Sequence, residues 1–254
     1  APMVGNYGVD PERSESGRVH ARGALMREAR GPAWTDWLHE RGIPALTGID
    51  TRSLVLRLRE VGAMRAAIVS GEASVDETLR AVRQQPPMAG RPLAASVSCD
   101  ESYEFAGGGR ARIAVVDYGC KRSILRRLAK TGAGVTVVPA TTGADELAGY
   151  DGVVLSNGPG DPEPLTAQVE AVRSLLGRAP VFGICLGHQL LALATGHETF
   201  KLPFGHRGAN HPVLEKATGR VLVTAQNHGF AVKPAAGREA THVSLYDGTV
   251  EGLD

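Results

Sequence analysis

The sequence predicts an α/β protein in two parts: a small mixed α/β domain over residues 1–99, and a doubly wound, mostly parallel-sheet domain over residues 111–254. Two observations lead to this prediction. In the second part, short apolar runs typical of strands buried on both faces alternate with segments of helical periodicity. Between the parts, residues 100–110 lack periodicity and include three consecutive glycines, Gly107 to Gly109, which indicates a linker.

Composition narrows the class of protein. The chain has 254 residues, of which 43% are hydrophobic and 22% charged, and its net charge is +1. This balance gives no general attraction to nucleic acid, and no apolar run approaches the ~18 residues of a membrane span. No signal peptide is visible and cysteine is sparse, with three residues. We therefore expect a cytoplasmic protein without a nucleic-acid or membrane partner.

The first part is predicted to hold three helices and one strand. Residues 34–41 form the first helix. The second runs from an N-cap at Asp50 to a C-cap at Gly62, with apolar residues four and seven apart. Residues 65–69 are predicted to form a strand, and Val75–Gln84 the third helix, which two prolines end.

The second part has a more regular pattern. Buried strands are predicted at 113–116, 135–138, Gly152–Leu155 and 181–184. Helices are predicted at Arg122–Lys130, at about 165–176 and at about 188–194. Strand and helix alternating with short turns indicates a parallel sheet. After Gly196 the pattern changes, and shorter strands of an antiparallel extension are predicted at 221–224, 230–232 and 242–245.

The strongest chemical signal surrounds Cys185. Gly183 and Gly187 flank it where the fourth strand passes into a helix, which is the G-x-nucleophile-x-G elbow. Glycine on both sides lets strand and helix approach closely around a strained residue. A helix N-terminus also favours the thiolate. The alternative is that Cys185 is a small buried hydrophobe, as most free cysteines are, but the intact elbow favours a nucleophile.

Two further segments carry polar or backbone groups suited to a site. Gly158-Pro159-Gly160 follows the third strand, where its backbone N–H groups could meet a developing oxyanion. Taken alone it is more typical of an ordinary loop. The stretch from Gln226 to Phe230 combines amide and imidazole side chains with a glycine, and taken alone it fits a turn.

Together these segments resemble the class I glutamine amidotransferase family, whose nucleophile is a cysteine on an elbow. Further segments narrow the resemblance to the small, glutamine-hydrolysing subunits of carbamoyl-phosphate synthetases. These are residues 204–212, residues 4–9, and the stretch from Gly48 to Arg52 before a helix. The resemblance covers nearly the whole chain.

The resemblance implies a role for each matching residue. Cys185 would attack the side-chain amide of glutamine, form a γ-glutamyl thioester and release ammonia. The backbone N–H groups of Gly158 and Leu186 would stabilise the oxyanion. The α-amino and α-carboxylate groups of glutamine would be held by Gly160, Gln189, Asn227, Gly229 and Phe230.

The resemblance also implies partners. The substrate would be L-glutamine, and ammonia would pass to a large synthetase subunit that uses ATP and magnesium to make carbamoyl phosphate for arginine and pyrimidine synthesis. The two subunits would form a heterodimer. No cofactor is expected in this chain, since it has no Walker loop, and no metal, since His206 and His211 have no visible partners for a metal site.

One part of the family pattern is missing. The family's base is a His, oriented by a Glu, in a His-Pro-Glu segment beyond the last strands, and none of the six histidines after Cys185 is followed by Pro-Glu. The first residues also enter in mid-pattern. We therefore expect the chain to be part of a longer protein, lacking both its start and its C-terminal end.

Three alternatives stay open at this stage. The chain could be a class I amidotransferase of another synthase, although residues 1–99 argue against that. It could be a catalytically incomplete scaffold subunit, which the missing His-Pro-Glu segment favours. An unrelated hydrolase with an elbow cysteine is the third alternative, disfavoured by the Gly-Pro-Gly loop and by Asn227-His228-Gly229.

Overall fold

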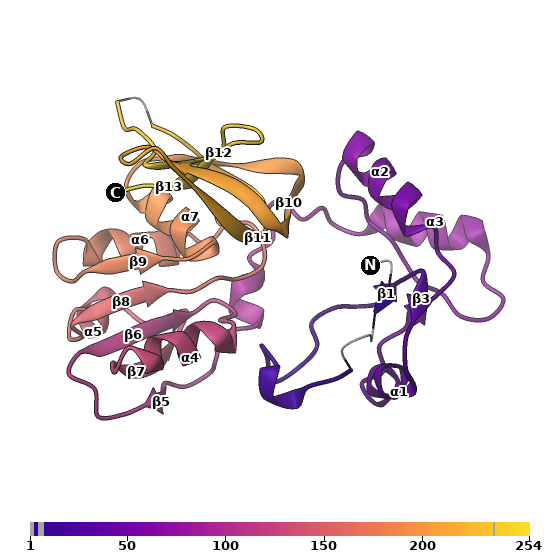
Figure 1. Cartoon of the computed structure of the whole chain (residues 1–254), viewed down its shortest axis with the longest axis horizontal. Coiled ribbons are helices and arrows are strands. Elements are labelled where there is room, and N and C mark those ends of the chain that lie inside the picture. The colour runs from indigo at the N-terminus through magenta and orange to yellow at the C-terminus, as the bar shows by residue number, and fades with distance from the viewer. Residues whose placement is uncertain (1–2, 5–7, 236) are drawn as a thin grey trace. The chain divides into compact units, whose positions relative to one another are not determined.

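The computed structural model describes residues 3–4, 8–235 and 237–254. The chain divides into two compact units, Ala1–Pro87 and Met88–Asp254 (Figure 1). The second unit therefore begins before the predicted residue 111. Residues 5–7, which belong to the motif at 4–9, lie outside the described residues. No helix in the described ranges is long and apolar enough to cross a lipid bilayer.

The second unit contains a five-stranded sheet in the order β5-β7-β6-β8-β9. Its strands are β5 (Tyr103–Ala106), β6 (Arg112–Asp117), β7 (Gly134–Pro139), β8 (Gly152–Leu155) and β9 (Val181–Gly183). β6 pairs in parallel with β7 and β8, and β8 with β9. The chain order reverses at β6, as in doubly wound folds, so the predicted parallel α/β sheet is confirmed.

The prediction that residues 100–110 lack regular structure is wrong. These residues include β5, which pairs antiparallel with β7 at the edge of the sheet. At least one residue of the glycine triplet is required by close packing of the backbone. A Cβ atom on Gly109 would lie 2.0 Å from the backbone nitrogen of Gly134, so the chain can pass there only without a side chain.

Helices cover both faces of this sheet. Ala114 and Val116 of β6 pack in a core with α5 (Ala144–Leu147), α6 (Thr166–Leu175) and α7 (Leu186–Ala194). Val115, which points to the opposite face, packs with Leu125 of α4 (Arg122–Lys130). This alternation follows from the two-residue period of a strand, and it explains why all three positions are apolar. The three predicted helices are confirmed, and the short α5 is an additional one.

A second, antiparallel sheet follows α7. It closes on itself in the order β10-β11-β13-β12, from β10 (Glu198–Glu215), β11 (Arg220–Lys233), β12 (His242–Ser244) and β13 (Val250–Gly252). The strands predicted at 221–224 and 230–232 are two stretches of β11, because the polar residues between them continue the pairing with β10. Ala192 of α7 packs against Val232 and Val250, which joins the elbow helix to this sheet.

The first unit holds the three predicted helices: α1 (Pro32–Glu40), α2 (Thr51–Val61) and α3 (Val75–Gln84). Asp50 caps α2 by accepting a 3.0 Å hydrogen bond from the backbone N–H of Ser53. The predicted strand at 65–69 is wrong, because this segment has no ladder partner. Instead, Arg65 donates to the backbone carbonyls of Arg83, in the last turn of α3, and of its C-cap residue Gln85.

Short paired strands complete the first unit. β1 (Met3–Val4) pairs with β3 (Glu28–Ala29), and β2 (Ala24–Leu25) with β4 (Ala45–Leu46), each in parallel. Two 3-10 turns also occur, η1 (Pro11–Arg13) in this unit and η2 (Leu93–Ser96) in the second. Two-residue strands leave almost no periodicity in a sequence, which explains why none of the four was predicted.

Candidate active site

Cys185 stands between β9 and α7 in a strained conformation. Its φ of 55° and ψ of −105° make it the one non-glycine residue with positive φ in the described part of the chain. Such a backbone costs on the order of 1–3 kcal/mol, and it persists only where the surroundings enforce it. The predicted elbow is therefore present, and α7 starts at the next residue, Leu186, two residues earlier than predicted.

The two flanking glycines make this turn possible, because neither has a side chain. A Cβ atom on Gly183 would lie 2.6 Å from the backbone oxygen of Gly187, and one on Gly187 would lie 2.1 Å from the backbone oxygen of Leu155. Both clashes are with backbone, so no side-chain rotation can relieve them. Strand β9, helix α7 and strand β8 thus touch through glycine backbone, which places Cys185 at the carboxyl edge of the parallel sheet.

Opposing influences act on the Cys185 thiol. Burial is the largest of them and raises the pKa of Cys185. Hydrogen bonds from the backbone N–H groups of Leu186 and Gly158 favour the thiolate, as does the positive charge of Lys121, whereas the Glu251 carboxylate opposes it. The two N–H groups that the family resemblance implies for an oxyanion therefore lie close enough to the sulfur atom to favour its charged form.

The loop that carries Gly158 is held tightly. A Cβ atom on Gly158 would lie 2.3 Å from the backbone oxygen of Tyr118. Asn157 accepts from the backbone N–H of Lys121 at 3.1 Å and donates to the carbonyl of Gly119, also at 3.1 Å. The loop after β8 is thus fastened to the loop after β6, so the N–H of Gly158 has a defined direction.

The same loop continues to a second anchored glycine. Gly160 has a φ of 97°, and a Cβ atom there would lie 2.6 Å from the backbone oxygen of Arg91. The neighbouring Asp161 is buried and accepts a 2.8 Å hydrogen bond from the backbone N–H of Gly90. Residues 90–93, which belong to the predicted first domain, therefore pack against this loop of the second unit.

The remaining predicted substrate residues fall into two groups. Gln189 of α7 donates its side-chain amide to the carbonyl of Phe230 on β11 over 2.8 Å, and both residues are buried. Asn227 instead accepts from the side chain of Arg207, and a Cβ atom on Gly229 would lie 3.7 Å from that guanidinium. Because side chains alternate along a strand, Asn227 and Gly229 lie on the opposite face of β11 from Phe230.

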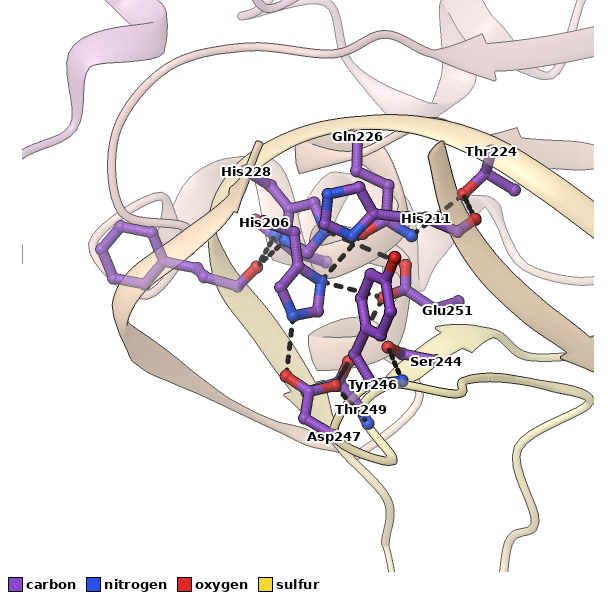
Figure 2. A network of polar contacts seen from close by, with 12 residues as sticks. His206, His211, Thr224, Gln226, His228, Ser244, Tyr246, Asp247, Thr249 and Glu251 are labelled. Atoms are coloured by element: carbon purple, nitrogen blue, oxygen red, sulfur yellow. Dashed lines mark hydrogen bonds and ion pairs between the residues drawn. The ribbon is translucent and has the colours of Figure 1, made fainter. Parts of the chain in front are cut away.

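Sequence reasoning missed a buried polar network on β10, β11 and β13 (Figure 2). His206 contacts Gln226, Asp247 and Glu251, and His228 contacts Gln226 and Glu251. His206 therefore has the partners that the sequence did not reveal. The two-residue spacing of Thr224, Gln226 and His228 could have suggested a common face, but the register with His206 could not be read from the sequence.

Lys121, an exposed residue, also acts on the elbow. The structure places Lys121 at the N-cap of α4, where its charge favours the Cys185 thiolate. A lysine in a loop fastened to Asn157 thus contributes to the electrostatics of the elbow.

Comparison with known proteins shows the family of this chain. Residues 114–254 match the family model described as glutamine amidotransferase class-I, and residues 1–68 match that of the carbamoyl-phosphate synthase small chain, CPSase domain. The carbamoyl phosphate synthase small chain of Syntrophotalea carbinolica is 45% identical over 100% of this chain and 74% of its own length. The chain belongs to this small-chain family.

Other members of the small-chain family show the same extent of likeness. The carbamoyl phosphate synthase small chain of Methanopyrus kandleri is 47% identical over 99% of this chain and 74% of its own length. That of Xanthomonas campestris is 43% identical over the same shares. A solved glutamine amidotransferase from Thermotoga maritima is more remote, at 16% identity and a TM-score of 0.44 over 56% of this chain and 70% of its own.

Proposed function

We propose that this small chain, a class I glutamine amidotransferase, hydrolyses glutamine through Cys185 for carbamoyl phosphate synthesis. The thiolate would attack the side-chain carbonyl carbon of glutamine and form a tetrahedral intermediate. The C–N bond would then break, with the nitrogen leaving as ammonia after it has gained a proton. Water would hydrolyse the γ-glutamyl thioester to glutamate and restore the thiol.

One observation carries this proposal: the strained conformation of Cys185 at the elbow, where the backbone N–H groups of Gly158 and Leu186 favour the thiolate. N–H groups that meet the sulfur are also placed to meet the oxygen of a carbonyl under attack by that sulfur. Fixed backbone donors need no reorganisation as charge develops. The rigid anchoring of the Gly158 loop supports the same role.

Glutamine recognition is proposed for residues around this elbow. A zwitterionic amino acid offers no large apolar handle, so backbone groups and amides must hold its α-amino and α-carboxylate groups. Gly160, with its positive φ, and the buried pair Gln189 and Phe230 would do this from the loop after β8, from α7 and from β11. Asn227 and Gly229 lie on the opposite face of β11 from Phe230, and their proposed part in glutamine binding rests on the family resemblance alone.

Ammonia delivery to a large subunit is proposed from the chemistry of the product. Free ammonia becomes protonated in water and then is no longer a nucleophile, so direct transfer to a bound partner would preserve it. ATP and magnesium would act on that partner, in a heterodimer. No residue of this chain is assigned as the base, because its 254 residues contain no His-Pro-Glu.

The covalent step is tested with an electrophilic glutamine analogue and intact-mass measurement. We expect one adduct per chain, mapped by peptide analysis to Cys185 and lost in Cys185→Ser. Cys120 is the matched control, because it is also half-buried but lies outside the elbow. Labelling at Cys120, or equal labelling of Cys185→Ser, would exclude the proposed nucleophile.

The partner is tested separately. The small chain and a large synthetase subunit, mixed at micromolar concentration, should elute as one species in size-exclusion chromatography. Separate elution would contradict delivery within a complex. If the complex forms but Cys185→Ser leaves glutamine-dependent carbamoyl phosphate formation unchanged, the chain is a scaffold instead of a glutaminase.

A further inference from the structure

We propose that His206, His228 and Glu251 form a binding site for one divalent transition-metal ion of the Zn²⁺ type. The coordinating atoms would be Nδ1 of His206, Nε2 of His228 and a carboxylate oxygen of Glu251 (Figure 2). All these atoms lie within 4.8 Å of one another. The proposal does not rest on glutamine hydrolysis, although this site shares the Phe230 carbonyl with Gln189 of the elbow helix and its Glu251 also acts on the Cys185 thiol.

Strand register brings these ligands together. His206 of β10 is the direct partner of His228 on β11, and their ring centroids are 4.9 Å apart. β13 contributes Glu251, whose neighbour Val250 pairs with Val232 of β11. Three strands of a closed sheet therefore supply one ligand each, on a framework of backbone hydrogen bonds that limits how far the ligands can separate.

In each imidazole, the ring nitrogen that points away from the proposed metal position (here the outer nitrogen) lies within hydrogen-bond distance of an acceptor. Nε2 of His206 lies 2.7 Å from the carboxylate of Asp247, and Nδ1 of His228 lies 2.8 Å from the backbone carbonyl of Phe230. Both outer nitrogens are therefore placed to donate, and in the neutral form each ring then keeps a lone pair on its inner nitrogen. Metal-binding histidines typically donate their second N–H to a carboxylate or a carbonyl in this way.

The inner nitrogens face more acceptors. Oε1 of Gln226 lies 2.8 Å from Nδ1 of His206 and 3.2 Å from Nε2 of His228. The orientation of the Gln226 side-chain amide is fixed by Thr224. The Thr224 hydroxyl donates its hydrogen to the carbonyl of His211, so the hydroxyl oxygen must accept from Nε2 of Gln226. Lone pairs of two imidazoles, one amide oxygen and one carboxylate thus converge with no donor among them.

A bound cation would stabilise these converging lone pairs, because it can accept electron density from several of them at once. A proton on Nδ1 of His206 would satisfy that ring alone and would leave Nε2 of His228 facing acceptors only. One divalent ion meets both rings, and its charge balances the carboxylates of Glu251 and Asp247. Nearly complete burial of the His206 side chain, 7% exposed, makes an uncompensated arrangement expensive.

The donor set selects the class of metal. Two imidazoles and one carboxylate are typical ligands of Zn²⁺, which takes them at about 2.0–2.2 Å in tetrahedral geometry, so that ligand atoms lie roughly 3.3 Å apart. One Glu251 oxygen lies 3.2 Å from Nδ1 of His206 and the other lies 3.9 Å from Nε2 of His228, so the side chains would have to draw together around the ion. Ca²⁺ and Mg²⁺ prefer all-oxygen sites.

Metal binding to the full chain is the test. After treatment with a chelator, the chain is titrated with Zn²⁺ in a calorimeter and with Co²⁺ in a spectrophotometer. We expect one ion per chain, visible-region Co²⁺ bands of a tetrahedral site, and no thiolate-to-cobalt charge transfer. Glu251→Gln and His206→Gln should each raise the Kd at least tenfold, and Asp247→Asn, which removes the carboxylate behind His206, roughly tenfold.

His242→Gln is the matched control. His242 belongs to the same sheet and lies 3.9 Å from a single carboxylate, that of Glu215, so its loss should leave metal affinity unchanged. Absence of stoichiometric binding, binding through thiolates, or equal weakening in the control would overturn the proposal. If a variant fails to fold, the native chain decides: Zn²⁺ should raise its Tm in a concentration-dependent manner and Mg²⁺ should not.

Discussion

Gln189 donates its side-chain amide to the backbone carbonyl of Phe230 over 2.8 Å, inside the protein. This bond joins the helix that follows the nucleophile to a strand of the closed sheet. The same carbonyl accepts from His228 at 2.8 Å, so Phe230 is a shared point between the elbow helix and the polar network.

Gln189→Leu should therefore destabilise the second unit by about 1–3 kcal/mol, because a buried hydrogen bond is lost without a substitute. Urea unfolding at constant m-value measures the change. Gln168→Leu on α6 is the control, since Gln168 makes only a 3.4 Å hydrogen bond from a half-buried position. Equal losses for the two variants would contradict this account.

Gly187→Ala should disrupt the elbow. The new Cβ would meet the backbone oxygen of Leu155 at 2.1 Å, so β8 and α7 must separate, and we expect a loss of about 3 kcal/mol or more together with loss of labelling at Cys185. Gly143→Ala is the matched control, because its Cβ would meet nothing within 4 Å. A change below about 0.5 kcal/mol is expected there.

Alkylation of Cys185 should show the influence of Lys121. Burial raises the pKa of the Cys185 thiol and the Lys121 charge opposes that rise. Lys121→Gln should therefore move the midpoint of alkylation rate against pH upward, since the thiolate loses a favourable charge. Lys130→Gln, at the other end of α4, should leave the midpoint in place. Peptide mapping separates Cys185 from the other two thiols.

His188 should make stability depend on pH. Burial, with the nearby charges of His228 and His197, lowers its pKa from 6.5 to about 4. The unfolded chain therefore binds a proton between these values that the folded chain does not. This contribution to stability is fully present above pH 6.5 and is lost as pH falls toward 4. Between these pH values, the free energy of unfolding should change less steeply with pH in His188→Gln than in the native chain.

The elbow could be predicted because its information is local. Gly183, Cys185 and Gly187 lie within five residues, and the clashes that require glycine are the physical reason for the pattern. The parallel sheet was predictable for a similar reason, since buried strands are apolar at every position. The limits of α2 followed from its capping residues, Asp50 and Gly62.

The histidine network could not be predicted because its information is distributed. His206 meets Glu251 only after β10 has passed through an irregularity in register between Lys201 and His206 and β13 has returned to the sheet. Residues 65–69 show the opposite difficulty. Their apolar run is typical of a strand, but strand formation depends on a partner, and the local pattern carries no information about one.

The alternation along β11 constrains how this family can vary in length. Even-numbered residues from Thr224 to Phe230 serve the buried network, whereas Asn227 and Gly229 face Arg207. An insertion or deletion of one residue in β11 would exchange these two sets. β10 has more freedom, because its irregularities between Lys201 and His206 and between Gly208 and His211 already absorb extra residues. Length changes among relatives should therefore accumulate in β10 and spare β11.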